Sequence, residues 1–146
     1  MEGLEKLKPL ALLLLRLGLG MIFIYYGYPK LANPGVYFKN FEGMGFPGYF
    51  SYLAGLIETF GGAMLIAGLF TRAAALLLSA EMAVAIARVH LPQGPITAVR
   101  NYQFPLALCL SSFALATIGA GLISIDHAIY GGGHSPSRKS RGKERN

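Results

Sequence analysis

Residues 52–91, YLAGLIETFGGAMLIAGLFTRAAALLLSAEMAVAIARVHL, decide the fold class of this chain. The stretch contains two apolar segments that only Thr71 and Arg72 separate. Each segment is close to the length of about 20 residues that a helix needs to cross a bilayer. Because so short a connection favours antiparallel neighbours, the stretch predicts a transmembrane helical hairpin.

Similar apolar segments lie on both sides of this hairpin. The sequence therefore predicts four membrane-spanning helices, at about residues 10–28, 49–70, 73–91 and 104–124. The composition agrees, because 53% of the residues are hydrophobic and 14% are charged, whereas a soluble domain carries about 25% charged residues. No small-residue cleavage site follows the first segment, so we interpret it as a spanning helix rather than a signal peptide. The predicted fold class is an all-α, polytopic membrane protein with a bundle of four transmembrane helices.

The basic residues near the helix ends predict the orientation of the chain. Cytoplasmic ends of membrane helices carry an excess of lysine and arginine. One side of the predicted bundle has eight basic residues, which are Lys6, Lys8, Arg72, Arg138, Lys139, Arg141, Lys143 and Arg145. The other side has Lys30, Lys39 and Arg100, with Arg88 near it. Both termini are therefore predicted to be cytoplasmic.

These features divide the chain into three predicted parts. They are a cytoplasmic N-terminus (1–9), a transmembrane domain (10–126) and a basic, disordered cytoplasmic tail (127–146). A basic tail beside a membrane helix is typical of a segment that faces anionic lipid, so the net charge of +6 does not indicate a nucleic-acid partner. Residues 29–48 mix prolines, glycines and aromatic residues, which predicts a loop or a short interfacial segment.

Four charged residues lie inside the predicted spans, where isolated charges are costly and usually paired. They are Arg16, Glu58, Glu81 and Arg88, and their charges sum to zero. Counting about 1.5 Å per residue from the cytoplasmic ends places Arg16 nearest in depth to Glu81, and Glu58 nearest to Arg88. Glu81 and Arg88 are seven residues apart and so share one helix face. These positions predict two ion pairs that either brace the bundle or line a polar pocket, and both interpretations stay open.

Polar and aromatic residues gather at the outer ends of the predicted helices, near the level of Glu58. They predict a candidate ligand pocket formed by Tyr26, Glu58, Arg88, His90 and Gln103. The hydroxyl, imidazole and amide groups of this set suit a quinone headgroup, which is planar and has two carbonyl acceptors. Tyrosines at this level are also typical of the aromatic belt of any membrane protein, so each tyrosine alone carries little weight.

Other cofactors and chemistries are not expected from this sequence. His90 and His127 are predicted on opposite sides of the membrane, too far apart to ligate one haem. The single cysteine, Cys109, excludes an intrachain disulfide, and the sequence has no metal-site or phosphate-loop motif. Since no complete catalytic constellation is visible, whether the chain is an enzyme stays undecided, and a non-catalytic subunit is the favoured interpretation.

Five segments, in this order, resemble the DoxX family of small four-helix bacterial membrane proteins and cover about residues 10–126. They are LLRLGLGMIFIYYGYPKL (14–31), YLAGLIETFGGAMLIAGLFTRAAALLL (52–78), ARVHLPQG (87–94), NYQFPLAL (101–108) and GAGLISID (119–126). Two positions depart from the family pattern, since Tyr26 stands where members often have histidine and Gln103 where many have glutamate. Both departures remove a titratable group, so proton-coupled chemistry is less expected there, while neutral hydrogen bonding to a headgroup is retained.

The resemblance implies a multi-pass protein of the bacterial cytoplasmic (inner) membrane that is a subunit or partner in redox reactions. Some relatives are similar to components of thiosulfate:quinone oxidoreductases, and others to membrane anchors of oxidative-stress complexes. Our leading hypothesis is an accessory or anchoring subunit that binds quinone or lipid and recruits a redox-protein partner. The alternatives left open are a structural or assembly factor that docks through its glycine-rich helix faces, and a small transporter. A homo-oligomer is compatible with each of these functions.

Overall fold

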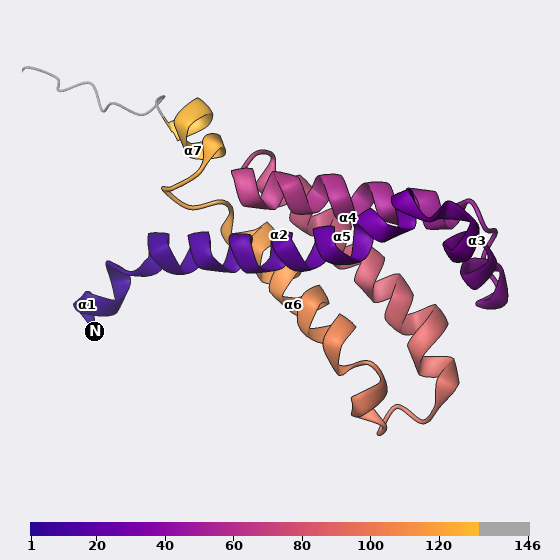
Figure 1. The fold of residues 1–146 in the computed structure, drawn as a ribbon. Coiled ribbons are helices and arrows are strands. Elements are labelled where there is room, and N and C mark those ends of the chain that lie inside the picture. The colour runs from indigo at the N-terminus through magenta and orange to yellow at the C-terminus, as the bar shows by residue number, and fades with distance from the viewer. Residues whose placement is uncertain (132–146) are drawn as a thin grey trace, which may run out of the picture.

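The structure is a computed structural model that describes residues 1–131, and in this range every regular element is helical (Figure 1). The α-helices are α1 (Glu2–Glu5), α2 (Lys8–Ala32), α3 (Pro34–Gly43), α4 (Phe50–Ala67), α5 (Thr71–Ala85), α6 (Gln103–Ile118) and α7 (Ile125–Tyr130). A π-helical turn (Ile86–His90) and a 3-10 turn (Leu91–Gln93) extend α5, and a second 3-10 turn (Val99–Asn101) precedes α6. The predicted all-α class is confirmed.

Three helical segments are long and apolar enough to cross a membrane, namely Lys8–Ala32, Phe50–Ala67 and Thr71–Gln93. The fourth predicted segment, 104–124, forms the shorter helix α6, which has 16 residues and ends at Ile118. Gly119 and Gly121 follow with φ angles of 94° and 81°, in the left-handed region where helices commonly terminate. Helices able to span a membrane are therefore confirmed for three of the predicted segments.

The first long helix extends beyond its predicted end at residue 28. α2 continues to Ala32 with Pro29 inside it, so part of the predicted loop 29–48 is helical, and α3 forms much of the rest. This extension places Lys30 on α2, where its Cβ lies 3.0 Å from a Cβ added to Gly55 of α4. A residue expected in a loop thereby becomes part of the helix interface.

The predicted disordered tail, 127–146, is helical at its start. Residues 127–130 complete α7, which Ser124 caps: its Oγ accepts a hydrogen bond from the backbone N–H of His127 at 3.1 Å. Serine at this position satisfies one of the unpaired N–H groups of a helix start, which stabilises this short helix. The remainder of the predicted tail, from residue 132 onward, lies outside the described residues.

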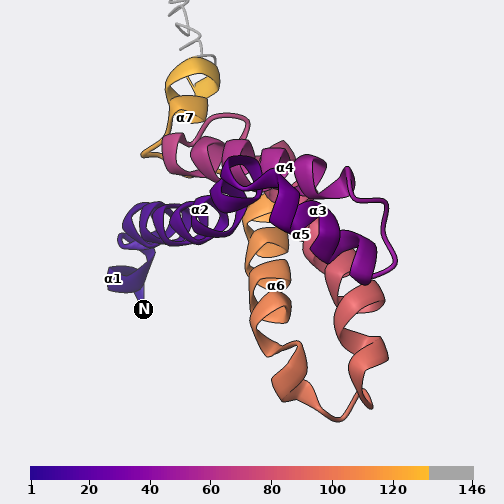
Figure 2. The ribbon, with the colours of Figure 1, turned by 45° about the vertical axis from the view of Figure 1, so that its right-hand side comes forward.

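The four long helices form two antiparallel pairs rather than an evenly closed bundle. α2 packs along α4, and α5 packs along α6. The contact between α4 and α5 joins the pairs, and the α5–α6 hairpin crosses the α2–α4 pair, with its loop end extending beyond it (Figures 1 and 2). Side chains from all four helices form the buried core, which includes Leu19, Phe23, Leu65, Ala75, Leu78 and Leu115.

Glycines set the distance between α2 and α4. A Cβ added to Gly20 would lie 2.6 Å from the carbonyl oxygen of Gly62, and one added to Gly62 would lie 2.7 Å from the carbonyl oxygen of Gly20. A Cβ added to Gly27 would lie 2.6 Å from the Cβ of Glu58. Backbones of membrane helices approach this closely where small residues stand at the interface. These three glycines are therefore used inside the chain and are not free docking surfaces.

A reciprocal polar contact joins α5 to α6. Ser79 Oγ donates a hydrogen bond to the carbonyl oxygen of Cys109 at 3.0 Å, and Cys109 Sγ donates to the carbonyl oxygen of Ser79 at 3.4 Å. Small polar side chains of this kind bond across helices within apolar surroundings. The cysteine of this chain therefore contributes to helix packing.

Gly20→Leu should destabilise the fold by about 1–3 kcal/mol, because a large side chain forces apart two backbones that are already in contact. Thermal unfolding of the detergent-purified protein, followed by circular dichroism, measures the effect. Gly18→Leu is the matched control on the same helix, since a Cβ added there has nothing within 4 Å. Equal loss of stability in both variants would contradict the role given to the glycine contact.

Candidate functional site

Arg16 is buried at the end of the fold where α7 lies, with 1% of its surface exposed. Its Nη1 donates hydrogen bonds to the carbonyl oxygens of Ala120, at 2.7 Å, and Ile123, at 2.8 Å. These carbonyls are free because the chain leaves helical geometry after α6. Carbonyl dipoles, rather than the carboxylate of Glu81, therefore stabilise the Arg16 charge, and the predicted pair of these two residues is not among the ion pairs of residues 1–131.

Asp126 connects the same end of the fold to the start of α5. Its carboxylate accepts hydrogen bonds from the backbone N–H of Phe70 at 2.7 Å and of Thr71 at 2.9 Å. An anionic acceptor is favourable at a helix N-terminus, where backbone N–H groups are unpaired. Phe70 has a φ of 47° and follows Gly68, which ends α4 with a φ of 70°. Asp126 thus holds the tight α4–α5 connection in place.

Glu58 lies in the middle of α4 with 3% of its surface exposed, and it forms an ion pair with Lys30 of α2. Gly27 allows this ion pair to form, because the absence of a side chain at position 27 lets the α2 backbone approach the Glu58 side chain. The structure therefore gives Glu58 a different partner from the predicted one, Arg88. Lys30 lies in the segment 29–48, which the sequence predicts as a loop outside the membrane spans.

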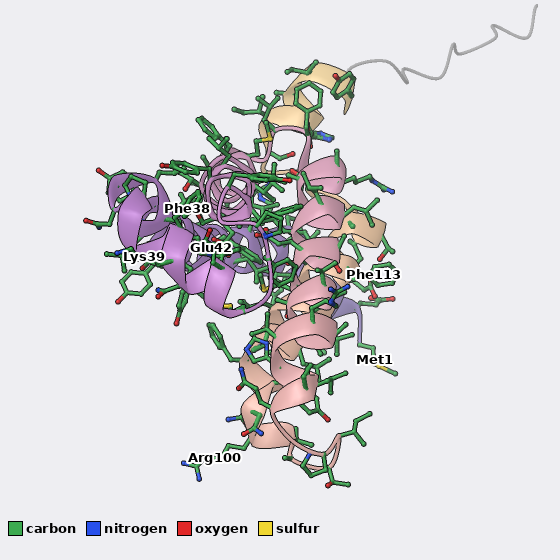
Figure 3. The ribbon with its side chains drawn as sticks, turned by 90° about the vertical axis from the view of Figure 1, so that its right-hand side faces the viewer. Met1, Phe38, Lys39, Glu42, Arg100 and Phe113 are labelled. Carbon is green, nitrogen blue, oxygen red and sulfur yellow. The ribbon has the colours of Figure 1, made fainter. Side chains whose placement is uncertain are left out.

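A cavity of about 520 Å³ lies beside this ion pair, between α3, α4 and α5. Its volume is within the usual range for small-molecule sites. Apolar and aromatic side chains form most of its wall, including Phe41, Phe46, Phe50, Leu53, Ile57, Leu77 and Val84. The polar groups at the wall are Lys30, Tyr37, Asn40, Glu58, Glu81 and His90. Figure 3 views the molecule from the side of α3, where Lys39 and Glu42 are labelled and Arg100 marks the distant loop end of the α5–α6 hairpin.

Glu81 contributes a second carboxyl group to the cavity wall, one helix away from Glu58. Its Oε2 is buried and has no hydrogen-bond partner within residues 1–131. The wall therefore carries two carboxyl groups and one lysine, and the lysine is bonded to the other carboxylate. A buried polar atom without a hydrogen-bond partner is costly. A ligand in the cavity that bonds to Glu81 would remove this cost.

Arg88 and His90 lie on the π-helical turn that follows α5. The predicted common face of Glu81 and Arg88 assumed an uninterrupted α-helix, whereas a π-helical turn changes the angular spacing of the residues within it. Arg88 consequently lies with its guanidinium carbon 5.8 Å from the ring centre of Phe46, in cation–π geometry. His90 lines the cavity, and its Nδ1 is 2.9 Å from the carbonyl oxygen of Ala85.

Three residues of the predicted pocket, Arg88, Tyr26 and Gln103, are not among the residues that line the cavity. Tyr26 contacts the rings of Tyr25 and Phe104, at centroid distances of 5.3 and 5.7 Å. Gln103 begins α6 and is exposed. The structure thus brings together Glu58 and His90 from the predicted set, and it adds Lys30 and Glu81. Within residues 1–131, no three His, Cys, Asp or Glu side chains gather as metal ligands.

Comparison with known proteins gives a family match. The sequence profile of the family described as DoxX matches residues 11–91, which include α4 and α5 with both carboxylates of the cavity. No solved structure matches the chain.

Two curated proteins are similar to this chain over most of their length. An uncharacterized protein of Haemophilus influenzae is 34% identical over 139 residues, which covers 89% of this chain and 98% of that protein. A protein of Bacillus subtilis named "Putative oxidoreductase CatD" is 31% identical over 120 residues, which covers 82% of this chain and 87% of that protein.

Lys30→Met should destabilise the protein by about 3–5 kcal/mol, because it leaves the buried Glu58 without a counter-charge. The double variant Lys30→Met/Glu58→Met should recover much of this loss, since it removes both charges together. Unfolding of the two variants in detergent measures the difference. Lys39→Met on the exposed surface of α3 is the control and should have little effect. A double variant no more stable than Lys30→Met alone would show that the ion pair is not what holds Glu58 in place.

Proposed function

The chain belongs to the DoxX family of membrane proteins, and from this premise we propose that it is an accessory or anchoring subunit of a redox system in the bacterial inner membrane. Such a system is either quinone-linked or part of an oxidative-stress complex. The observation that carries the proposal is the cavity between α3, α4 and α5, with the Lys30–Glu58 ion pair at its wall. The name of the Bacillus subtilis relative, which describes an oxidoreductase, supports the redox assignment.

The cavity suits a planar ring with an apolar tail. Phe41, Phe46 and Phe50 offer ring faces against which a flat headgroup stacks. Lys30 has three ammonium hydrogens, so bonding to Glu58 leaves it able to donate to a carbonyl oxygen as well. A quinone combines these features and reaches such a cavity from the surrounding lipid.

The topology we propose has four spans with both termini in the cytoplasm. It divides the chain into an N-terminus (1–9), a transmembrane domain (10–126) and a tail (127–146). α6 is about 24 Å long at 1.5 Å per residue, somewhat less than the hydrocarbon thickness, and a shorter span is accommodated by local thinning of the bilayer. Its packing along α5 supports a position at the same depth as that spanning helix.

Cysteine labelling tests this topology. In a Cys109→Ser background, a membrane-impermeant maleimide should label Ala98→Cys in intact spheroplasts, because this position is on the outer loop of the proposed fold. Gly3→Cys and Gly131→Cys should react only after the membrane is permeabilised, since both lie on the cytoplasmic side. Reaction of Gly131→Cys in intact spheroplasts would show that α6 does not cross the membrane.

Extraction of the purified protein tests the ligand. We expect about one quinone per chain after purification in mild detergent, measured by chromatography and mass spectrometry. Ala54→Phe should reduce this amount to the level of the surrounding lipid extract, because Ala54 lines the cavity and a phenyl group fills it. Ala63→Phe is the matched control on α4, since Ala63 is exposed and does not line the cavity.

The outcome also separates the proposed function from its main alternative. Quinone that is absent from the wild-type protein, or equal in the two phenylalanine variants, would remove the support for a quinone-linked subunit. A partner protein recovered in equal amount with the chain, without a bound small molecule, would instead indicate a structural or assembly factor.

A further inference from the structure

Glu58 and Glu81 lie at the same cavity wall in different charge environments. Lys30, the lysine of this wall, forms its ion pair with Glu58. Oε2 of Glu81 is buried and has no hydrogen-bond partner within residues 1–131. Burial disfavours the charged form of a carboxyl group unless an opposite charge lies close to it. Glu58 is therefore held as a carboxylate, whereas Glu81 is expected to carry a proton.

The titratable and charged groups around Glu81 come from every element that packs against α5 or extends it. They are Lys30 of α2, Tyr37 of α3, Glu58 of α4, Arg88 and His90 of the π-helical turn, and Cys109 of α6. Arg88 lies over the ring of Phe46, and Nδ1 of His90 donates to the carbonyl oxygen of Ala85. None of the ion pairs of residues 1–131 includes Glu81, which agrees with a neutral carboxyl group at this position.

A protonated carboxyl group donates a hydrogen bond as well as accepting one. Rotation about its last side-chain bond is soft, so the hydrogen is free to point into the cavity. We propose that Glu81 binds the ligand of this cavity in its protonated form, by donating this hydrogen to a carbonyl oxygen of the ligand. The inference rests on the proposed function, because it assigns a donor and a protonation state to that same quinone site.

Lys30 and Glu81 then give the cavity two donors, one from α2 and one from α5. A quinone has two carbonyl acceptors, at opposite edges of its ring. When Glu81 loses its proton, its carboxylate only accepts, and a ligand carbonyl oxygen beside it faces a second acceptor with no hydrogen between them. Ligand affinity should therefore be complete while Glu81 is protonated and should fall as rising pH ionises it.

A pH series of duroquinone binding tests this. Binding to the full chain in lipid nanodiscs is measured by equilibrium dialysis, and empty nanodiscs at each pH correct for partition into lipid. The series runs from about pH 6, where exposed carboxyl groups are already ionised, to about pH 9.5, below the ordinary values of lysine and tyrosine. We expect the affinity of the wild-type chain to fall about tenfold over this range, since a lost buried hydrogen bond changes a binding constant roughly 5- to 150-fold.

Three variants assign the effect to the Glu81 proton. Glu81→Gln keeps a neutral donor, so it should bind duroquinone about as well as the wild-type chain does at low pH, and equally at every pH. Glu81→Met has no donor and should bind about tenfold more weakly throughout. Glu42→Gln is the control, because it makes the same change at an exposed residue of α3 that does not line the cavity, and the wild-type pH dependence should persist.

Each result has a separate meaning. Wild-type affinity that is constant over the series, or higher at high pH, overturns the role of the proton and leaves the quinone-linked function standing. No binding at any pH overturns both. A decline that persists in Glu81→Gln belongs to another group and overturns the role of Glu81.

Infrared spectroscopy of the wild-type chain decides the question if the Glu81 variants fail to fold. The C=O band of a protonated carboxyl group should shift when duroquinone binds and should disappear at the high end of the pH series. A band that is absent, or that duroquinone does not shift, overturns the inference.

Discussion

Gly20 and Gly62 bring the backbones of α2 and α4 into direct contact, and a Cβ on either residue would lie within 2.7 Å of the carbonyl oxygen of the other. Further along the same interface, Gly27 lets α2 approach Glu58. Lys30 is one helical turn beyond Gly27 and so reaches the carboxylate. Without this close approach Glu58 would be a charge in an apolar interior with no counter-charge, which is costly in a membrane protein.

The other ionisable groups inside the fold are stabilised by different means. Arg16 is bonded to backbone carbonyls that become free where the chain leaves α6, so its hydrogen bonds go to carbonyl oxygens and not to a carboxylate. Asp126 is satisfied by the backbone N–H groups at the start of α5. Helix ends thus provide partners for one cation and one anion, and Lys30 neutralises Glu58. Glu81 differs from these groups, because its buried Oε2 has no hydrogen-bond partner within residues 1–131 and lies at the cavity wall.

The cavity itself depends on a segment that is not part of the membrane-spanning pairs. α3 and the residues after it supply Tyr37, Phe41 and Phe46 to the wall, opposite Glu81 of α5. The π-helical turn places His90 at this wall and turns Arg88 toward Phe46. Inserted π-helical turns are frequent at functional sites, because they redirect side chains without ending the helix.

The sequence alone determined the helical class, the family and the approximate positions of the long helices, because apolar segments of this length are a property of the local chain. It also predicted a pocket that includes Glu58 and His90, and in the structure both residues line one cavity. The partner of Glu58 was decided only by the tertiary structure. The sequence places each charge in depth by assuming straight α-helices with the predicted ends. That assumption misses the continuation of α2 through Pro29, the π-helical turn after Ala85 and the glycine contact between α2 and α4. Ion pairs depend on distances between helices, and those distances are set by side-chain volumes at an interface that the linear sequence does not display.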